Sequence, residues 1–227
     1  MACGGWGRCE ALARRLFTRS RTAAVIAVLA VGACGSPYYT SDPIEAWVVD
    51  ADTGKPIEGA IVAANWQLVA SGLDTGGRKL RQLEVMETVT DKDGRFRFPG
   101  FTRINFSLDQ LREEDPQILI FKPGYRYLRV VNRHREDKPS GSHRVANVNG
   151  NRLPLHQGAA DIHRYASELD LITTNVSAVI YNDDPSKLAK LINALACERR
   201  RLVRLDGTVS MSVPGETAIR VQCDDEK

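Results

Sequence analysis

The hydrophobic positions of this chain change their spacing along the sequence, and each spacing predicts a different kind of element. Residues 23–33 form one continuous apolar run without polar residues at helical spacing. From residue 44 to about residue 131, short runs rich in Val, Ile, Trp, Phe and Tyr alternate with turns that carry Asp, Gly and Pro. After residue 159, apolar residues recur every three or four positions. The pattern predicts an apolar leader, a β-rich part and a helical part, in that order.

The β-rich part predicts six strands, at residues 44–50, 57–67, 82–90, 95–98, 117–122 and 125–132. Side chains alternate across a strand, so Phe96 and Phe98 face one way while Arg95 and Arg97 face the other. Several short strands joined by turns are typical of a sandwich. We expect its core to contain Trp47, Val49, Ile61, Phe96, Phe98 and Ile120, with Arg95, Arg97 and Lys122 exposed.

Two polar segments interrupt these patterns. Residues 102–115 form a charged insertion that we expect to carry a helical turn. Residues 132–158 are polar, with Gly, Pro, Ser and Asn at turn positions, and predict a linker or a long loop. Asp91-Lys92-Asp93-Gly94 could begin a calcium loop, but such a loop ends with a glutamate some six residues after the glycine, where this chain has Gly100. A turn is the better interpretation.

The helical part predicts two amphipathic helices. Asp184 can cap the second helix, with Pro185 in its first position. Both apolar stripes are explained if the helices pack on each other or on the sandwich. The alternative is that the stripes form a groove that binds a partner. The first stripe comprises Ile162, Tyr165, Ala166, Leu169, Ile172, Val176 and Val179, and the second comprises Leu188, Leu191, Ile192, Leu195 and Leu202.

The apolar leader has the features of an export signal. Its run of about 11 residues is too short to span a bilayer, which takes roughly 20 residues. Five arginines precede the run, and small residues stand before Cys34, as in a signal peptide. Val31-Gly32-Ala33-Cys34 resembles a bacterial lipobox. That resemblance implies a lipid on Cys34, cleavage before it, and attachment to the membrane through this lipid.

Removal of residues 1–33 changes the charge and the cysteine content. The remaining chain has 26 Lys and Arg against 27 Asp and Glu, a net charge of −1. Since no basic stripe remains, we expect no nucleic-acid partner. Besides Cys34, only Cys197 and Cys223 remain, and an oxidising compartment favours a disulfide between them.

Three blocks of the β-rich part resemble one known family. The sequences AWVVDADTGKPIEGAIVAANW, ETVTDKDGRFRFPGF and ILIFKPGYR are similar to the carboxypeptidase regulatory-like domain. The resemblance implies a transthyretin-like seven-stranded β-sandwich, here followed by a C-terminal helical hairpin, in a mainly β fold with α. The expected organisation is a lipoprotein signal peptide at 1–33, a tether at 34–43, the sandwich at 44–131, the linker or loop at 132–158 and the helical extension at 159–227.

No catalytic motif, phosphate loop or dinucleotide fingerprint occurs in the sequence. His134, His143, His156 and His163 lack the spacing of metal ligands, so we predict no catalytic residue, metal or cofactor. The expected function is that of a lipid-anchored cell-envelope protein, a non-catalytic binding or structural accessory module. Its expected location is the outer membrane, facing the periplasm, and its expected partner an envelope protein or glycan. The alternative is a hydrolase or metal-dependent enzyme that acts on an envelope polymer, with a site built from the linker histidines and the sandwich loops.

Overall fold

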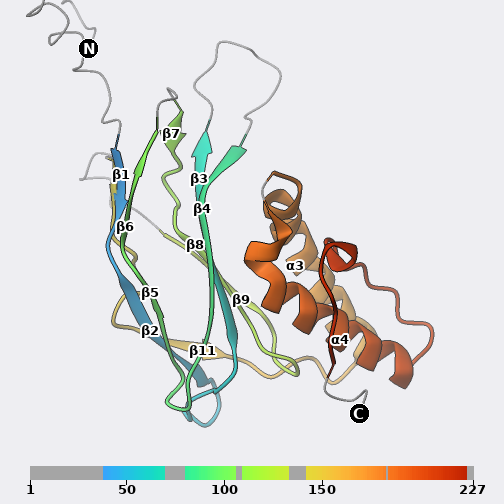
Figure 1. Ribbon diagram of the computed structural model, residues 1–227. Coiled ribbons are helices and arrows are strands. Elements are labelled where there is room, and N and C mark those ends of the chain that lie inside the picture. Colours follow the sequence, from blue (N-terminus) through green and yellow to red (C-terminus); the bar gives the residue numbers. More distant parts are fainter. Residues whose placement is uncertain (1–37, 70–79, 106–108, 133–141, 183, 224–227) are drawn as a thin grey trace, which may run out of the picture. The chain divides into compact units, whose positions relative to one another are not determined.

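A computed structural model of the protein describes residues 38–69, 80–105, 109–132, 142–182 and 184–223, without the side chains of residue 80 and residues 175–182. The expected signal peptide, Cys34 and His134 lie outside the described residues, as do the side chains of Val176 and Val179. Within this part, two three-stranded sheets form an outer layer, a five-stranded sheet forms an inner layer, and the helices form a third layer (Figure 1). A β-sandwich followed by two C-terminal helices, as the sequence predicts, is therefore confirmed.

The two outer sheets are formed by the same three stretches of chain. The first has the strand order β10-β1-β6 and the second β11-β2-β5. Pro43 and Pro99 stand at the breaks between successive strands, where a residue without an N–H group ends a ladder. The strands are β1 (Tyr38–Ser41), β2 (Ile44–Asp50), β5 (Arg95–Phe98), β6 (Phe101–Ile104), β10 (His143–Arg144) and β11 (Arg152–Leu155).

The inner sheet is antiparallel, with the order β4-β3-β8-β9, and β7 pairs with the end of β3. Its central strand β3 is buried along almost its whole length, because another layer covers each face of the sheet. The strands are β3 (Ile61–Val69), β4 (Leu80–Val89), β7 (Gln110–Leu111), β8 (Gln117–Phe121) and β9 (Leu128–Val131).

Alternation along the inner strands divides the apolar residues between two cores. In β3, Val62 and Trp66 pack in the core between the sheets, while Ile61 and Ala63 pack against the helices. The turn before β5 depends on a glycine: Gly94 has a φ of 70°, and a Cβ there would collide with the Val48 carbonyl. Asp91 Oδ1 accepts the N–H groups of residues 93 and 95, which confirms a turn at this position.

The helical layer covers the face of the inner sheet that points away from the outer sheets (Figure 1). It consists of α3 (Ile162–Asn182), η2 (Pro185–Leu188), α4 (Ala189–Leu205) and η3 (Glu216–Ala218). Asp184 caps η2 and accepts the Ser186 N–H at 2.9 Å, with Pro185 at the start of the helix, as predicted. All five residues of the second apolar stripe are buried, so this stripe packs in the core.

Several expectations need correction. Trp47 is only half-buried, because Ala46 and Val48 occupy the inward positions of β2, and Lys122 is half-buried rather than exposed. The described part of residues 102–115 contains strands β6 and β7 and no helical turn. Residues 132–158, expected as a linker or loop, supply β10 and β11, which pair in parallel with β1 and β2. The described residues form eleven short strands rather than seven, since breaks divide three outer strands into six and the two-residue β7 is added.

The other core predictions are confirmed. Val49, Ile61, Phe96, Phe98 and Ile120 are all buried, and Arg95 and Arg97 are exposed.

Candidate functional site

A buried polar cluster lies where β7 and the start of β8 meet the end of β3. The Asp115 side chain is 0% exposed, and its Oδ2 accepts the backbone N–H of Gln67. The Gln67 Oε1 atom in turn accepts hydrogen bonds from Arg112 Nη1 at 2.9 Å and Gln117 Nε2 at 3.2 Å. The Asn132 amide donates to the Asp115 carbonyl at 3.0 Å. These bonds join β3 to the segment between β7 and β8 and to the end of β9.

The same cluster attaches the segment after β9 to the outer sheet. Arg144 of β10 is 1% exposed, and its Nη2 donates to the carbonyls of Leu111 at 3.1 Å and Arg112 at 3.3 Å. The Asn132 amide also donates to the Val145 carbonyl at 2.8 Å, and its oxygen accepts the Asn147 N–H at 2.8 Å. A charge that is removed from water needs such acceptors to offset its lost hydration.

Burial controls the electrostatics of the cluster. Desolvation raises the pKa of Asp115 to about 7, although the Gln67 N–H and the charges of Arg112 and Arg144 act in the opposite direction. Desolvation lowers the pKa of Arg144, and the nearby Asp115 opposes this effect. A carboxyl group that titrates near neutral pH is often found at functional sites. Asp115 has no exposed surface, however, so in this conformation its carboxyl group joins strands and touches no substrate.

A second polar contact attaches the helical layer to the inner sheet. The residue before α4, Leu188, makes no side-chain capping bond. Instead, Glu87 of β4 accepts the N–H groups of Lys190 at 3.0 Å and Leu191 at 2.6 Å. Desolvation raises the pKa of Glu87, while these two hydrogen bonds oppose the rise. Glu87 thus replaces a local cap at the N-terminus of α4, where backbone donors otherwise stay unpaired.

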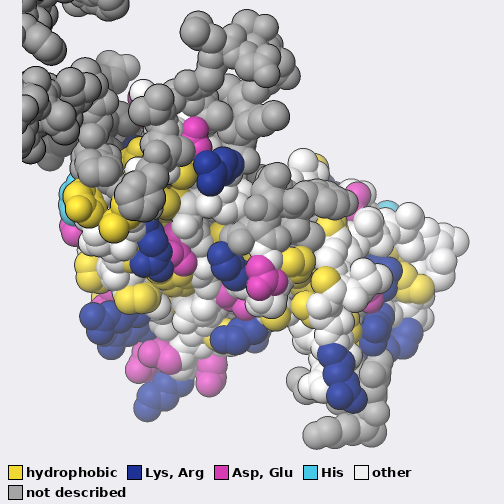
Figure 2. All heavy atoms as spheres, turned by 45° about the horizontal axis from the view of Figure 1, so that its top comes forward, with side chains coloured by type: hydrophobic (Ala, Val, Ile, Leu, Met, Phe, Trp, Pro, Cys, Tyr) yellow, Lys and Arg dark blue, Asp and Glu magenta, His cyan; other side chains and the backbone are white. Residues whose placement is uncertain are grey.

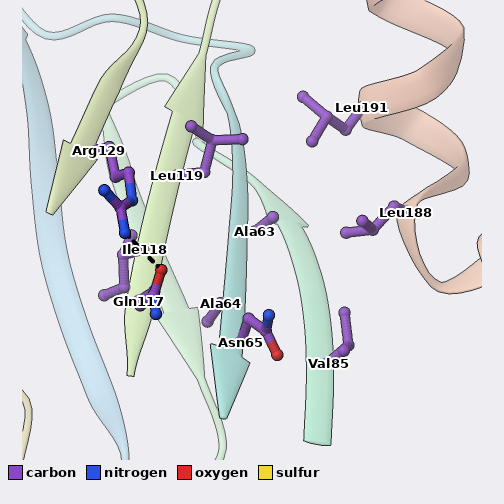
Figure 3. A pocket seen from close by; sticks show the side chains of 10 residues that line it. All are labelled: Ala63, Ala64, Asn65, Val85, Gln117, Ile118, Leu119, Arg129, Leu188 and Leu191. Atoms are coloured by element: carbon purple, nitrogen blue, oxygen red, sulfur yellow. Dashed lines mark hydrogen bonds between the residues drawn. The ribbon is translucent and has the colours of Figure 1, made fainter. Parts of the chain in front are cut away.

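A small hollow lies between the inner sheet and the helical layer. Figure 3 shows Ala63, Val85 and Leu119 on the sheet facing Leu188 and Leu191 on the helical side. On the same sheet, Arg129 Nη2 donates to Gln117 Oε1 at 2.9 Å, as drawn in Figure 3. The hollow measures about 40 Å³, which is room for a few water molecules. The remaining lining residues are Ala64, Asn65 and Ile118.

The structure brings the two predicted disulfide partners together. Cys197 of α4 and Cys223 have their Cα atoms 5.5 Å apart, a separation compatible with a disulfide. The chain beside them is also held by Asn193, whose side chain donates to the Gln222 carbonyl at 2.9 Å and accepts the Gln222 N–H at 2.7 Å. The tail therefore reaches α4 through hydrogen bonds that do not involve sulfur.

We expect replacement of both Cys197 and Cys223 by serine to lower the free energy of unfolding by about 3.5 kcal/mol. In the chain-entropy model, this is the contribution of a bridge across a separation of 26 residues. Urea unfolding of the two proteins measures the difference, and peptide mapping without reduction should find the two cysteine peptides linked. Recovery of both cysteines as free thiols after alkylation of the exported protein would contradict the bridge.

The other predicted features are spread over the chain or lie outside its described part. Cys34, the predicted lipidation site, lies outside it. His143 contacts Thr40 and Asp42, and His163 contacts Asp206, so these two histidines belong to different elements. Among the described residues, no group of three or more His, Cys, Asp or Glu side chains could hold a metal ion. No helix in this part of the chain is long and apolar enough to cross a membrane.

Sequence reasoning did not find the Asp115 cluster or the Glu87 cap. Asp115 follows Arg112-Glu113-Glu114, a charged run that reads as exposed. Glu87 shares a face of β4 with the buried Val85, but its charge reads as solvent-facing. Segments distant in sequence bury Asp115 completely and Glu87 in part. The only local signal is Pro116, which fixes the end of the charged run immediately before β8.

Comparisons with known proteins give no family for the chain. No protein-family model matches it, and no curated protein matches it. Among solved structures, it is similar to a 3-chlorocatechol 1,2-dioxygenase from Rhodococcus opacus, with 16% identity over 52% of this chain and a TM-score of 0.32. It is also similar to a catechol 1,2-dioxygenase from Pseudomonas arvilla, with 18% identity over 57% of this chain and a TM-score of 0.33.

A third structure is the C-terminal domain of a shaft pilin from Lactobacillus rhamnosus, with 12% identity, a TM-score of 0.23, and matches covering 54% of this chain and all of that domain. The chain matches 60% and 56% of the lengths of the two dioxygenases. Overlap at these TM-scores supports no argument about activity, so the functional conclusion depends on this chain's own residues.

Proposed function

We propose that the protein is a lipid-anchored component of the bacterial cell envelope and that its sandwich, a carboxypeptidase regulatory-like domain, is a non-catalytic binding or structural accessory module. The leader supports the anchor: a basic segment, a short apolar run and the sequence Val31-Gly32-Ala33-Cys34 occur in the order that export and lipidation require. Gly35 after the cysteine favours the outer membrane, facing the periplasm.

One observation carries the proposal. The first described element, β1, begins at Tyr38, four residues after Cys34. Cleavage before Cys34 would therefore remove no strand or helix of the described fold. Polar groups support the structural half of the proposal, because the buried Asp115 and Arg144 and the half-buried Glu87 use their hydrogen bonds to join elements.

Replacement of Cys34 by serine should abolish the incorporation of labelled palmitate and leave the protein uncleaved or soluble. A single acyl chain gives only marginal membrane binding, so the two or three chains of a bacterial lipoprotein should make release negligible. The measurement is labelling in growing cells followed by membrane fractionation. Ser36→Ala, two residues away, is the matched control and should label like the wild type. Palmitate in the Cys34→Ser protein would overturn the anchor.

The binding role makes a separate prediction. Incubated with peptidoglycan, lipopolysaccharide or polysaccharide fragments, the protein should retain one of them without changing its mass. Mass spectrometry of the recovered fragments distinguishes binding from hydrolysis. Shortened fragments that depend on the folded protein would favour the enzyme alternative. A metal analysis of the same preparation tests the metal-dependent form of that alternative.

A further inference from the structure

Two large apolar side chains lie side by side on the surface where the outer sheet begins. Tyr38 is 51% exposed and Ile104 is 54% exposed. They are direct partners across the antiparallel pair β1 and β6, so they project from the same face of the sheet. Tyr39, the next residue in β1, is buried, which identifies that face as the outer one. Figure 2 shows hydrophobic side chains gathered on this side of the molecule, at the upper left.

The length of the chain that precedes this pair limits its distance from the lipid. Four residue steps separate Cys34 from Tyr38. Even fully extended, such a segment spans at most about 14 Å. A cysteine that carries acyl chains lies at the boundary between the hydrocarbon and the headgroups. The start of β1 therefore lies no more than about 14 Å from that boundary, close enough to reach the headgroup layer, which is about 5 to 7 Å thick on each side.

The chemistry of the pair suits that layer. Tyrosine is enriched at membrane–water interfaces, where its ring contacts apolar groups and its hydroxyl stays hydrated. Two described cations near the pair form ion pairs: Arg103 with Glu84, and Arg81 with Asp109 at 3.0 Å. Among the residues that the structure describes, this end of the sandwich thus presents apolar surface beside paired charges, which favours a bilayer interface over an anionic polymer as its partner.

We propose that Tyr38 and Ile104 rest in the headgroup layer of the membrane that holds the Cys34 lipid, and this inference rests on the proposed anchor. In this orientation, the end of the sandwich formed by the start of β1 and the end of β6 faces the bilayer. The turns at residues 51–54 and 91–94, at the opposite end of these strands, point away from it (Figure 1). The membrane-distal turns are then the surface available to an envelope partner.

The test places an environment-sensitive fluorophore on the full-length lipoprotein. Ile104→Cys and Tyr38→Cys are labelled without reduction, and the protein is reconstituted into vesicles of phosphatidylethanolamine and phosphatidylglycerol with a nitroxide on some headgroups. We expect each label to lose most of its fluorescence to the nitroxide. Lys92→Cys, in the opposite turn, is the matched control and should keep its fluorescence. Leu205→Cys controls for a label at an exposed apolar residue of the helical layer.

Palmitate labelling of each variant separates this inference from the anchor. Palmitate incorporation with equal quenching at positions 104 and 92 would overturn the orientation and leave the anchor intact. Absence of palmitate from all variants and from the wild type would overturn the anchor, and the orientation with it. Quenching at positions 38 and 104, without quenching at positions 92 and 205, supports the proposed surface. Both patch positions are exposed, so either variant tests the surface if the other fails to fold.

Discussion

Replacing Phe96 with alanine is expected to lower the free energy of unfolding by about 3 to 5 kcal/mol, as large aromatic truncations in cores do. Phe96 is 1% exposed and packs in the core between the sheets, with its ring centroid 5.8 Å from that of Phe98 in an edge-on arrangement. Its strand pairs with the edge of β2, so the surrounding backbone cannot collapse freely into the space left behind. Urea unfolding followed by tryptophan fluorescence measures the loss.

Arg97→Ala is the matched control, because Arg97 is the next residue in the same strand and is exposed. A surface substitution of this kind usually changes stability by no more than about 0.5 kcal/mol. If the two variants unfolded at the same urea concentration, the assignment of the inward face of β5 would be wrong.

The proton on Asp115 is expected to contribute up to about 4 kcal/mol to the free energy of unfolding, depending on pH. The pKa of Asp115 rises from an ordinary 3.8 to about 7 in the fold, and each unit corresponds to about 1.36 kcal/mol. Since the folded state holds the proton more tightly, this contribution is most favourable below pH 3.8. It declines as the pH rises to about 7 and stays at its minimum above that.

Comparison of the wild type with Asp115→Asn isolates this contribution, because the amide does not titrate. Between pH 5 and pH 8, the stability of the wild type relative to the variant should fall by about 2 to 3 kcal/mol. Glu113→Gln removes a charge at an exposed position two residues away and controls for net charge. A constant difference between wild type and Asp115→Asn across this range would show that Asp115 does not hold its proton in the fold.

Local sequence patterns predict the elements of this fold better than their pairing. The alternation of Phe96 and Phe98 and the cap at Asp184 depend on neighbouring residues, and both are confirmed. The parallel pairing of β11 with β2 brings Leu153 beside Val48, more than a hundred residues earlier in the chain. Nothing in the polar segment that contains β11 encodes that partner. The large Trp47, expected in the core, is only half-buried, and the small Ala46 holds the core position.

The candidate site was less predictable than the fold for the same reason. Asp115 has a raised pKa only because distant segments cover it, and Arg144 is buried only because β7 offers its carbonyls. The cysteine pair was predictable, since two cysteines of an exported chain have few partners to choose from.

The Glu87 cap makes the order of assembly depend on the sheet. Glu87 precedes the backbone donors that it binds by 103 and 104 residues, so α4 obtains this cap only after β4 has formed. Most of the stability of a helix such as α4 comes from the packing of its apolar face rather than from intrinsic helix propensity. We therefore expect the inner sheet to form first and the helical layer to pack on it afterwards. In hydrogen exchange, the first turn of α4 should open at a lower free energy than β3.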